Sequence, residues 1–324
     1  MKRKINNNLK SILFFILKVF LISIVVLLIV KFTKNKTNDI SESKINSMMM
    51  LIEFEKIDGI LQWEKELDSR GLTALIKVQD NVLKENPEVF KRLADKGHEI
   101  AGGYSIAPFW DMSYEEQYNY LKESKELVEK VTGKKMRVGS SRYFAYDETT
   151  LKVADALGIE YILGRGTKDV EAVVYQPKEY KVKVISVTNV DVGEPMGRGS
   201  LCDYSLWARG ADAKEFGKIF NESLAKKPTN MILVSHAYLG GTRLEWWQEY
   251  EKALASDKAD WNGFDNWLEK QEIITLNNAE IPMNKEVKYV NPNPAKPMED
   301  YEPISGIEDV GIAIPTVTDS MMCQ

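Results

Sequence analysis

The sequence predicts an α/β fold in which helices surround a largely parallel sheet, preceded by one transmembrane helix. Two features of the 324 residues support the sheet and its helices. From Met48 onward, short apolar runs alternate with longer amphipathic segments, as strands and helices do. This alternation repeats about seven or eight times, which favours a (β/α) barrel over an open sheet.

Residues 12–30 form the predicted transmembrane anchor, because Lys18 is the only charged residue in this apolar segment. A helix of about 20 apolar residues crosses the hydrocarbon core of a bilayer. Basic residues within 1–11 favour a short cytoplasmic tail, so the main domain is expected to be extracytoplasmic. No small-residue cleavage site follows the apolar segment, which favours an anchor over the alternative of a cleaved signal peptide.

A polar linker over residues 31–47 precedes a domain that is predicted over residues 48–281. After Ile281 the alternation stops, and the Pro-rich, acidic residues 282–324 predict an irregular tail with at most one strand. Within the domain, the predicted strands are the short apolar runs at 48–55, 72–79, 98–103, 159–164, 180–188, 230–237 and 273–276.

The predicted helices are the amphipathic segments between these strands, and two of them carry terminal signals. Pro87 stands in the first turn of one helix, and Gly97 follows its end. Ser113 and Glu116 have the spacing of a capping box at the start of another. The predicted helices cover 57–71, 86–97, 113–133, 147–158, 212–227 and 263–272.

The composition excludes some classes of partner and site. A net charge of −5 argues against nucleic acid as a partner, because phosphate binding requires a basic surface. The two cysteines, Cys202 and Cys323, form no disulfide framework and no Cys-x-x-Cys pair. The chain has two histidines, His98 and His236, which sharply limits any metal site built on histidine.

Three segments, residues 86–103, 112–135 and 144–164, resemble in order and spacing the polysaccharide deacetylases of the NodB-homology type, carbohydrate esterase family 4. The resemblance spans about residues 48–276. It implies a distorted (β/α) barrel with an incomplete ring of strands. It also implies metal-assisted amide hydrolysis, in which one Asp and two His hold a divalent metal, usually zinc. A second Asp acts as the base, and a late His acts as the acid.

The resemblance assigns the metal positions to residues that cannot bind a metal. Glu55 takes the position of the base, and Lys56 takes that of the metal-binding Asp. Gly103 and Ala107 replace the two histidines and carry no ligand atoms. A charged ammonium has no lone pair to donate and repels a dication. We therefore expect no metal and no other cofactor, and we expect Lys56 either to fill the vacated cation position or to be an ordinary polar residue.

The remaining family motifs give further candidate residues. Tyr143 matches the tyrosine of the third motif, and Arg142 is a candidate for the space of the family's arginine, whose own position is Ser140. Asp191 is the acid nearest to the fourth motif. His236 takes the acid position in Val-Ser-His, with a structural hydrogen-bonding role as the alternative.

Aromatic residues in the later part of the chain are candidates for glycan contacts. Trp246 and Trp247 are adjacent on a predicted helix, where neighbouring side chains point in different directions. At least one of them is therefore expected near the surface, as a platform for a sugar ring together with Tyr143. Packing in the core is the alternative for both tryptophans. His98 is expected to be a buried histidine bonded to the backbone.

Three functions are compatible with these features. The first is a membrane-anchored, extracytoplasmic pseudoenzyme. It would bind a cell-surface glycan or a protein partner through the groove that corresponds to the family's active site. The second is an active deacetylase that removes N- or O-acetyl groups from cell-wall or surface polysaccharide with a rebuilt site. The third is a structural domain of the cell envelope. The loss of all three metal ligands favours the first.

Overall fold

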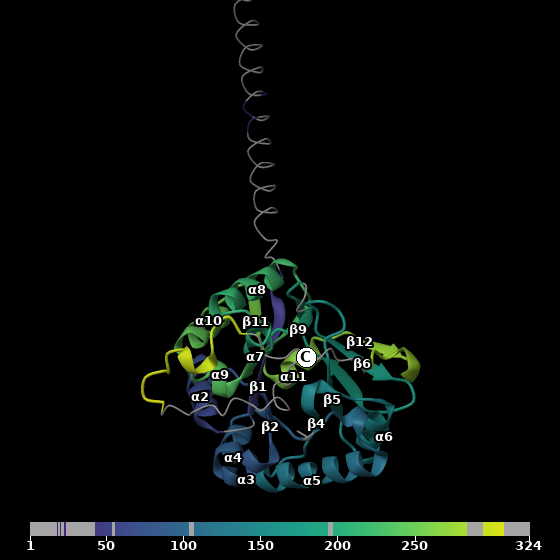
Figure 1. Cartoon of the computed structure of the whole chain (residues 1–324). Helices are drawn as coiled ribbons and strands as arrows, with labels where there is room; N and C mark the ends of the chain where they lie inside the picture. The colour runs from purple at the N-terminus through teal and green to yellow at the C-terminus, as the bar shows by residue number, and fades with distance from the viewer. Residues whose placement is uncertain are drawn as a thin grey trace, which may run out of the picture. The chain divides into compact units, whose positions relative to one another are not determined.

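The computed structural model describes residues 43–53, 56–103, 107–193, 197–283 and 294–307, together with Lys18, Phe20 and Ser23 (Figure 1). Contacts divide the chain into two compact units, Met1–Ser43 and Lys44–Gln324. The three described residues of the predicted anchor are helical, and the rest of residues 12–30 lies outside the described residues. Among the described residues, no helix has the length and apolar character needed to cross a membrane.

The first sheet of the Lys44–Gln324 unit is entirely parallel. It consists of β1 (Ile45–Glu53), β2 (Leu75–Val78), β3 (Glu99–Ala101), β10 (Asn230–His236) and β11 (Ala259–Trp261). The order is β10-β1-β2-β3, and β11 pairs with the start of β1. All nine residues of β1 are buried, as expected of a central strand covered on both faces.

The second sheet contains one antiparallel pair, between β6 and β7. It consists of β4 (Val138–Gly139), β5 (Tyr161–Gly164), β6 (Val173–Pro177), β7 (Lys183–Ser186) and β12 (Ile273–Leu276). The order is β12-β6-β7-β5-β4, and the other pairs are parallel. A separate antiparallel hairpin joins β8 (Asn189–Asp191) to β9 (Arg198–Ser200).

The two sheets meet where β3 and β4 lie side by side. Gly102 bridges Gly139 in parallel, and the Ser140 amide donates to the Gly102 carbonyl at 2.8 Å. At the far edge of the first sheet, Cys202 forms an isolated bridge with Val234 of β10. The strand pairs among the described residues do not close into a ring. The predicted α/β fold is thus confirmed, and its described strands form an open series.

Helices surround the strands, as Figure 1 shows for α2, α3, α4, α5, α6, α8 and α10 at the rim of the unit. The helices are α2 (Asp58–Arg70), α3 (Asp80–Glu85), α4 (Pro87–Asp95), α5 (Tyr114–Thr132), α6 (Glu148–Ala156), α7 (Asp203–Trp207), α8 (Ala213–Ala225), α9 (Ala237–Gly240), α10 (Leu244–Leu254) and α11 (Phe264–Glu269). The 3₁₀ turns are η1 (Phe109–Asp111), η2 (Arg142–Phe144), η3 (Asn278–Glu280) and η4 (Met298–Asp300). The predicted terminal signals are confirmed: Pro87 begins α4, and Ser113 and Glu116 form a capping box at α5.

Two predicted boundaries differ from the structure. The first strand begins at Ile45, inside the predicted linker, because Asn46 is buried and its side-chain amide donates to Asn230 and to the Trp267 carbonyl. The described part of the tail, residues 294–307, is irregular as predicted but packs on the domain. There, the Leu244 amide donates to the Glu302 carbonyl at 2.8 Å.

Candidate functional site

The candidate site lies where the first sheet ends. Ile52, near the carboxyl end of β1, is in register with Lys77 of β2 and with His236 of β10. Lys77 is in turn in register with Ala101 of β3. The carboxyl ends of these parallel strands therefore share one edge of the sheet. In α/β folds this edge is where binding and catalytic residues gather.

The structure places the family's metal positions after β1 and β3, at this edge. Lys56 is exposed, and among the described residues it makes no ion pair. Gly103 is buried and adopts a φ of +89°. A Cβ built on Gly103 would lie 2.8 Å from Leu121 Cδ2 and 3.0 Å from the Ser140 carbonyl oxygen. The predicted base, Glu55, lies outside the described residues.

These positions do not fit the metal that the family uses. The glycine and Ala107 have no ligand atoms, and the lysine carries a positive charge. A side chain at position 103 would also be strained by the positive φ and crowded by Leu121 and the Ser140 carbonyl oxygen. The opposite side of the same edge, after β10, holds a different and fully buried group of polar side chains.

His236 ends β10 and contacts Asp203, the first residue of α7. Both side chains are completely buried. His236 Nδ1 lies 3.3 Å from Asp203 Oδ1, and the His236 backbone amide donates to the same oxygen at 2.8 Å. Cys202 Sγ lies 3.8 Å from His236 Nδ1. The bridge between Cys202 and Val234 explains the proximity, because it holds the start of α7 against β10.

The contacts of His236 determine its protonation. Burial alone would lower the pKa of His236, but the hydrogen bonds with Asp203 and Cys202 outweigh it and raise the pKa to about 9. A protonated imidazole beside a buried carboxylate is an arrangement able to hold and donate a proton. His236 thus lies at the edge where it was predicted. Its role as the acid stays a prediction.

Basic side chains converge on the segment that follows β4. The ammonium of buried Lys77 donates to the Ser141 carbonyl at 2.6 Å and lies 4.6 Å from the centre of the Phe144 ring. Arg165 Nε donates to the Tyr143 carbonyl at 3.0 Å. Tyr143 and Phe144 both have positive φ, 61° and 53°. This backbone is uncommon for aromatic residues, and it marks the segment as strained.

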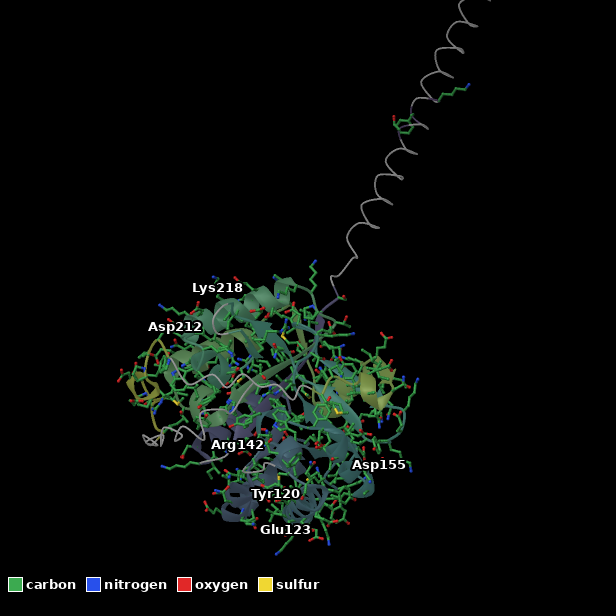
Figure 2. The ribbon with its side chains drawn as sticks, turned by 45° about the vertical axis from the view of Figure 1, so that its right-hand side comes forward. Tyr120, Glu123, Arg142, Asp155, Asp212 and Lys218 are labelled. Atoms are coloured by element: carbon green, nitrogen blue, oxygen red, sulfur yellow. The ribbon has the colours of Figure 1, made fainter. Side chains whose placement is uncertain are left out.

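Arg142 belongs to the same segment and is 8% exposed. Figure 2 shows Arg142 inside the outline of the domain, whereas Glu123 of α5 and Lys218 of α8 lie at opposite outer surfaces. The guanidinium of Arg142 lies 5.6 Å from the centre of the Tyr143 ring. Ser140, at the family's arginine position, is fully buried, and its hydroxyl donates to the Ser141 carbonyl.

Four predicted site residues do not lie where a site residue is expected. Asp191 is exposed at the end of β8, and its carboxylate accepts a hydrogen bond from the Gly193 amide at 2.9 Å. Tyr143 is 3% exposed and presents no face to a sugar. Trp246 and Trp247 are 0% and 5% exposed. Both tryptophans pack in aromatic clusters: Trp246 lies 5.6 Å from Phe216 and 5.9 Å from Tyr301, and Trp247 lies 5.0 Å from Trp63.

Sequence reasoning missed Asp203, Cys202, Lys77 and Arg165. The signal for Asp203 is its place directly before the aromatic residues of "DYSLW", at the start of a helix that follows a strand. Lys77 stands inside an apolar strand, where a charged residue is unusual and points to a specific contact. The prediction for His98 is confirmed: it is 3% exposed, and its Nδ1 accepts from the Ala74 amide at 3.1 Å.

The comparisons with known proteins support the fold. A family description of polysaccharide deacetylases matches residues 63–162. No curated protein matches the chain, whereas 44 chains of solved structures do. A putative polysaccharide deacetylase from Mycobacterium smegmatis is 14% identical with a TM-score of 0.54, and the match covers 73% of this chain and 95% of that one.

Two further solved structures illustrate the range of similar proteins. PuuE allantoinase is 13% identical with a TM-score of 0.55, and the match covers 71% of this chain and 91% of that one. A mutant of a CE4 family pseudoenzyme from Bacillus anthracis, with restored enzymatic activity, is 13% identical with a TM-score of 0.50. That match covers 71% of this chain and 70% of the mutant. Residues 63–162 thus match the polysaccharide deacetylase family, and the described residues share the fold of solved polysaccharide deacetylase and CE4 structures.

Proposed function

We propose that this chain is a deacetylase-like protein that has lost the family's metal-dependent hydrolysis and binds polysaccharide. The observation that carries the proposal is the backbone of Gly103, whose φ of +89° and crowded Cβ direction make a histidine at that position strained. Lys56 and Ala107 supply no ligand either. Without a metal to polarise the acetamide carbonyl and activate water, the family's reaction lacks its main source of transition-state stabilisation.

A polysaccharide is the ligand that the family suggests, and a half-buried tryptophan near the same edge is a suitable contact for a sugar ring. Trp110 of η1 follows the loop after β3. The guanidinium of Arg165, which follows β5, lies 5.3 Å from the centre of the Trp110 ring. An aromatic ring fixed in this way offers a flat apolar surface to a sugar ring. Trp110 therefore replaces the buried Trp246 and Trp247 as the candidate platform.

Binding and activity are tested on the full chain in detergent, with acetylated chitooligosaccharides. We expect retention of the acetyl groups and measurable binding. Trp110→Ala should weaken binding about 10-fold to 100-fold, since a stacked ring contributes about 1–3 kcal/mol in comparable stacking. Trp261→Ala is the matched control, because Trp261 is also half-buried but belongs to β11, which pairs with the start of β1 at the opposite edge. Equal effects of the two variants, or no binding, would contradict the proposal.

The proposal also places the domain outside the cytoplasm, on the apolar segment 12–30. Its support is the hydropathy of that segment and the basic residues before it. Protease treatment of intact cells and of inverted membrane vesicles tests the orientation. The domain should be degraded in the first preparation and protected in the second.

An active deacetylase with a rebuilt site is the second candidate. The observation that favours it is the His236–Asp203 contact, which keeps a proton donor at the family's acid position. In this case the acetylated oligosaccharide would be hydrolysed, and His236→Gln would abolish the activity. Release of acetate by the wild-type chain would therefore contradict the proposed loss of hydrolysis and support an active deacetylase.

A further inference from the structure

Three side chains with metal-binding atoms meet between α7 and β10. They are Cys202, Asp203 and His236, and one ligand atom from each lies within 4.8 Å of the other two. All three side chains are completely buried. A thiolate, a carboxylate and an imidazole are the three side-chain ligand types that zinc uses in proteins. Of the described residues, this is the group of such side chains that could hold a metal ion.

Two of the distances between the ligand atoms are close to those around a tetrahedral ion. Zinc lies about 2.0–2.2 Å from nitrogen and oxygen ligands and about 2.3 Å from sulfur, so tetrahedral ligands are separated by roughly 3.3–3.6 Å. The Nδ1 atom of His236 is 3.3 Å from Asp203 Oδ1 and 3.8 Å from Cys202 Sγ. These two distances differ from the tetrahedral values by at most a few tenths of an ångström, and the ligand atoms of Cys202 and Asp203 lie within 4.8 Å of one another.

Hydrogen bonds from neighbouring residues already orient the ligands. The Ser235 hydroxyl donates to Asp203 Oδ2 at 2.9 Å, and the Tyr204 amide donates to Asp203 Oδ1 at 2.7 Å. The Ser205 amide donates to Cys202 Sγ at 3.2 Å. Supporting contacts of this kind fix the orientation of ligands in metal sites and raise the affinity.

Gly240 of α9 closes the same site from another side. A Cβ at this position would lie 2.2 Å from the Ser235 hydroxyl and 2.5 Å from Asp203 Oδ2. The backbone of α9 therefore packs directly on the carboxylate and its hydrogen-bond donor, and a side chain at position 240 would displace both.

We propose that Cys202, Asp203 and His236 bind a zinc ion that is distinct from the metal of the family. The family positions Lys56, Gly103 and Ala107 lie after β1 and β3, whereas these three ligands lie at α7 and the end of β10. The ion would fix the start of α7 on β10, and three protein ligands leave the fourth position of a tetrahedral ion to a non-protein ligand. Binding displaces the thiol proton and the proton on Nδ1, so metal uptake releases protons to the solvent.

The proposal is tested by metal titration of the full chain, first stripped with a chelator. Equimolar Co²⁺ is the probe, because a cobalt–thiolate bond produces a charge-transfer band in the near ultraviolet. We expect one Co²⁺ per chain, displaced by one Zn²⁺. Cys202→Ser should remove the band, and Cys323→Ser, the matched cysteine control, should retain it. Ser235→Ala, which removes a supporting hydrogen bond, should weaken the affinity by about 10-fold to 100-fold.

The metal titration of the wild-type chain tests the proposed zinc site even if a variant at a buried position fails to fold. No uptake of equimolar Co²⁺ or Zn²⁺ by the folded wild-type chain would overturn the proposal and leave a hydrogen-bonded group without a metal. A charge-transfer band that persists in Cys202→Ser would also overturn it. The site does not depend on the proposed function: a chain that binds zinc but no polysaccharide would support the site and contradict that function.

Discussion

Replacing Gly103 with alanine tests whether the family's first histidine position can accept any side chain. The φ of +89° at Gly103 is unfavourable for an L-residue, by about 1–2 kcal/mol. The new Cβ would also meet Leu121 Cδ2 at 2.8 Å and the Ser140 carbonyl oxygen at 3.0 Å. Such overpacking costs about 1–3 kcal/mol. We therefore expect Gly103→Ala to lower the free energy of unfolding by about 2–5 kcal/mol.

Gly97→Ala separates the two contributions. Gly97 has a similar φ of +97°, but its Cβ would have Thr73 Cγ2 at 3.7 Å as its nearest neighbour, which is an ordinary contact. This variant should lose only the conformational part, about 1–2 kcal/mol. Thermal unfolding of the full chain in detergent, followed by circular dichroism, measures both variants at about 2–4 °C per kcal/mol. If Gly103→Ala melts no lower than Gly97→Ala, the argument from crowding is refuted.

The same crowding bears on any attempt to rebuild the family's metal site. Lys56→Asp, Gly103→His and Ala107→His, combined in a Cys202→Ser background, restore the ligand types without the proposed new site. We expect this variant to bind no zinc, because the histidine at position 103 cannot enter the space beside Leu121. A folded variant that binds one zinc ion would show that the loop rearranges and that the crowding is not decisive.

Three other predictions follow from buried groups. Trp246→Ala should cost about 3–5 kcal/mol in a denaturant titration, because the ring is fully buried against Tyr301 and its neighbours; an unchanged midpoint would contradict this. Burial lowers the pKa of His98 from 6.5 to about 4, so stability should fall as the pH drops between these values, and His98→Gln should flatten that slope. Hydrogen bonding by Arg92 lowers the pKa of Glu64 from 4.5 to about 2. About 2 kcal/mol of stability should therefore be lost as the pH falls from 4.5 to 2, and the Glu64→Gln variant should not show this loss.

Local signals in the sequence predicted much of the fold. The alternation of apolar and amphipathic segments located the central strands, and the capping box at Ser113 located the start of α5. Such features depend on residues close in sequence. The short strand β11 was missed because its three residues include Asp260 and show no apolar run. It exists because it pairs with the start of β1, which is a long-range contact.

The candidate site was harder to predict for the same reason. Trp246 and Trp247 were expected to divide between core and surface, since adjacent helical residues point in different directions. Both are buried because α10 is covered on more than one side, by α2 through Trp63 and by the tail through Tyr301. The sequence contains no local sign that residues 294–307 return to this helix. Asp203 was missed for the same reason. A long-range bridge between Cys202 and Val234 places the start of α7 beside β10 and therefore Asp203 beside His236.

The two sides of the site's edge differ in how much the fold depends on them. Lys56 follows the end of β1 and is exposed, so a change there costs the fold little. Asp203 instead accepts from the amides of His236 and Tyr204 while fully buried. Removing one partner of such a buried charged pair costs about 3–5 kcal/mol. We therefore expect His236→Gln or Asp203→Asn to destabilise the fold far more than a substitution at Lys56, whether or not the His236–Asp203 contact serves catalysis.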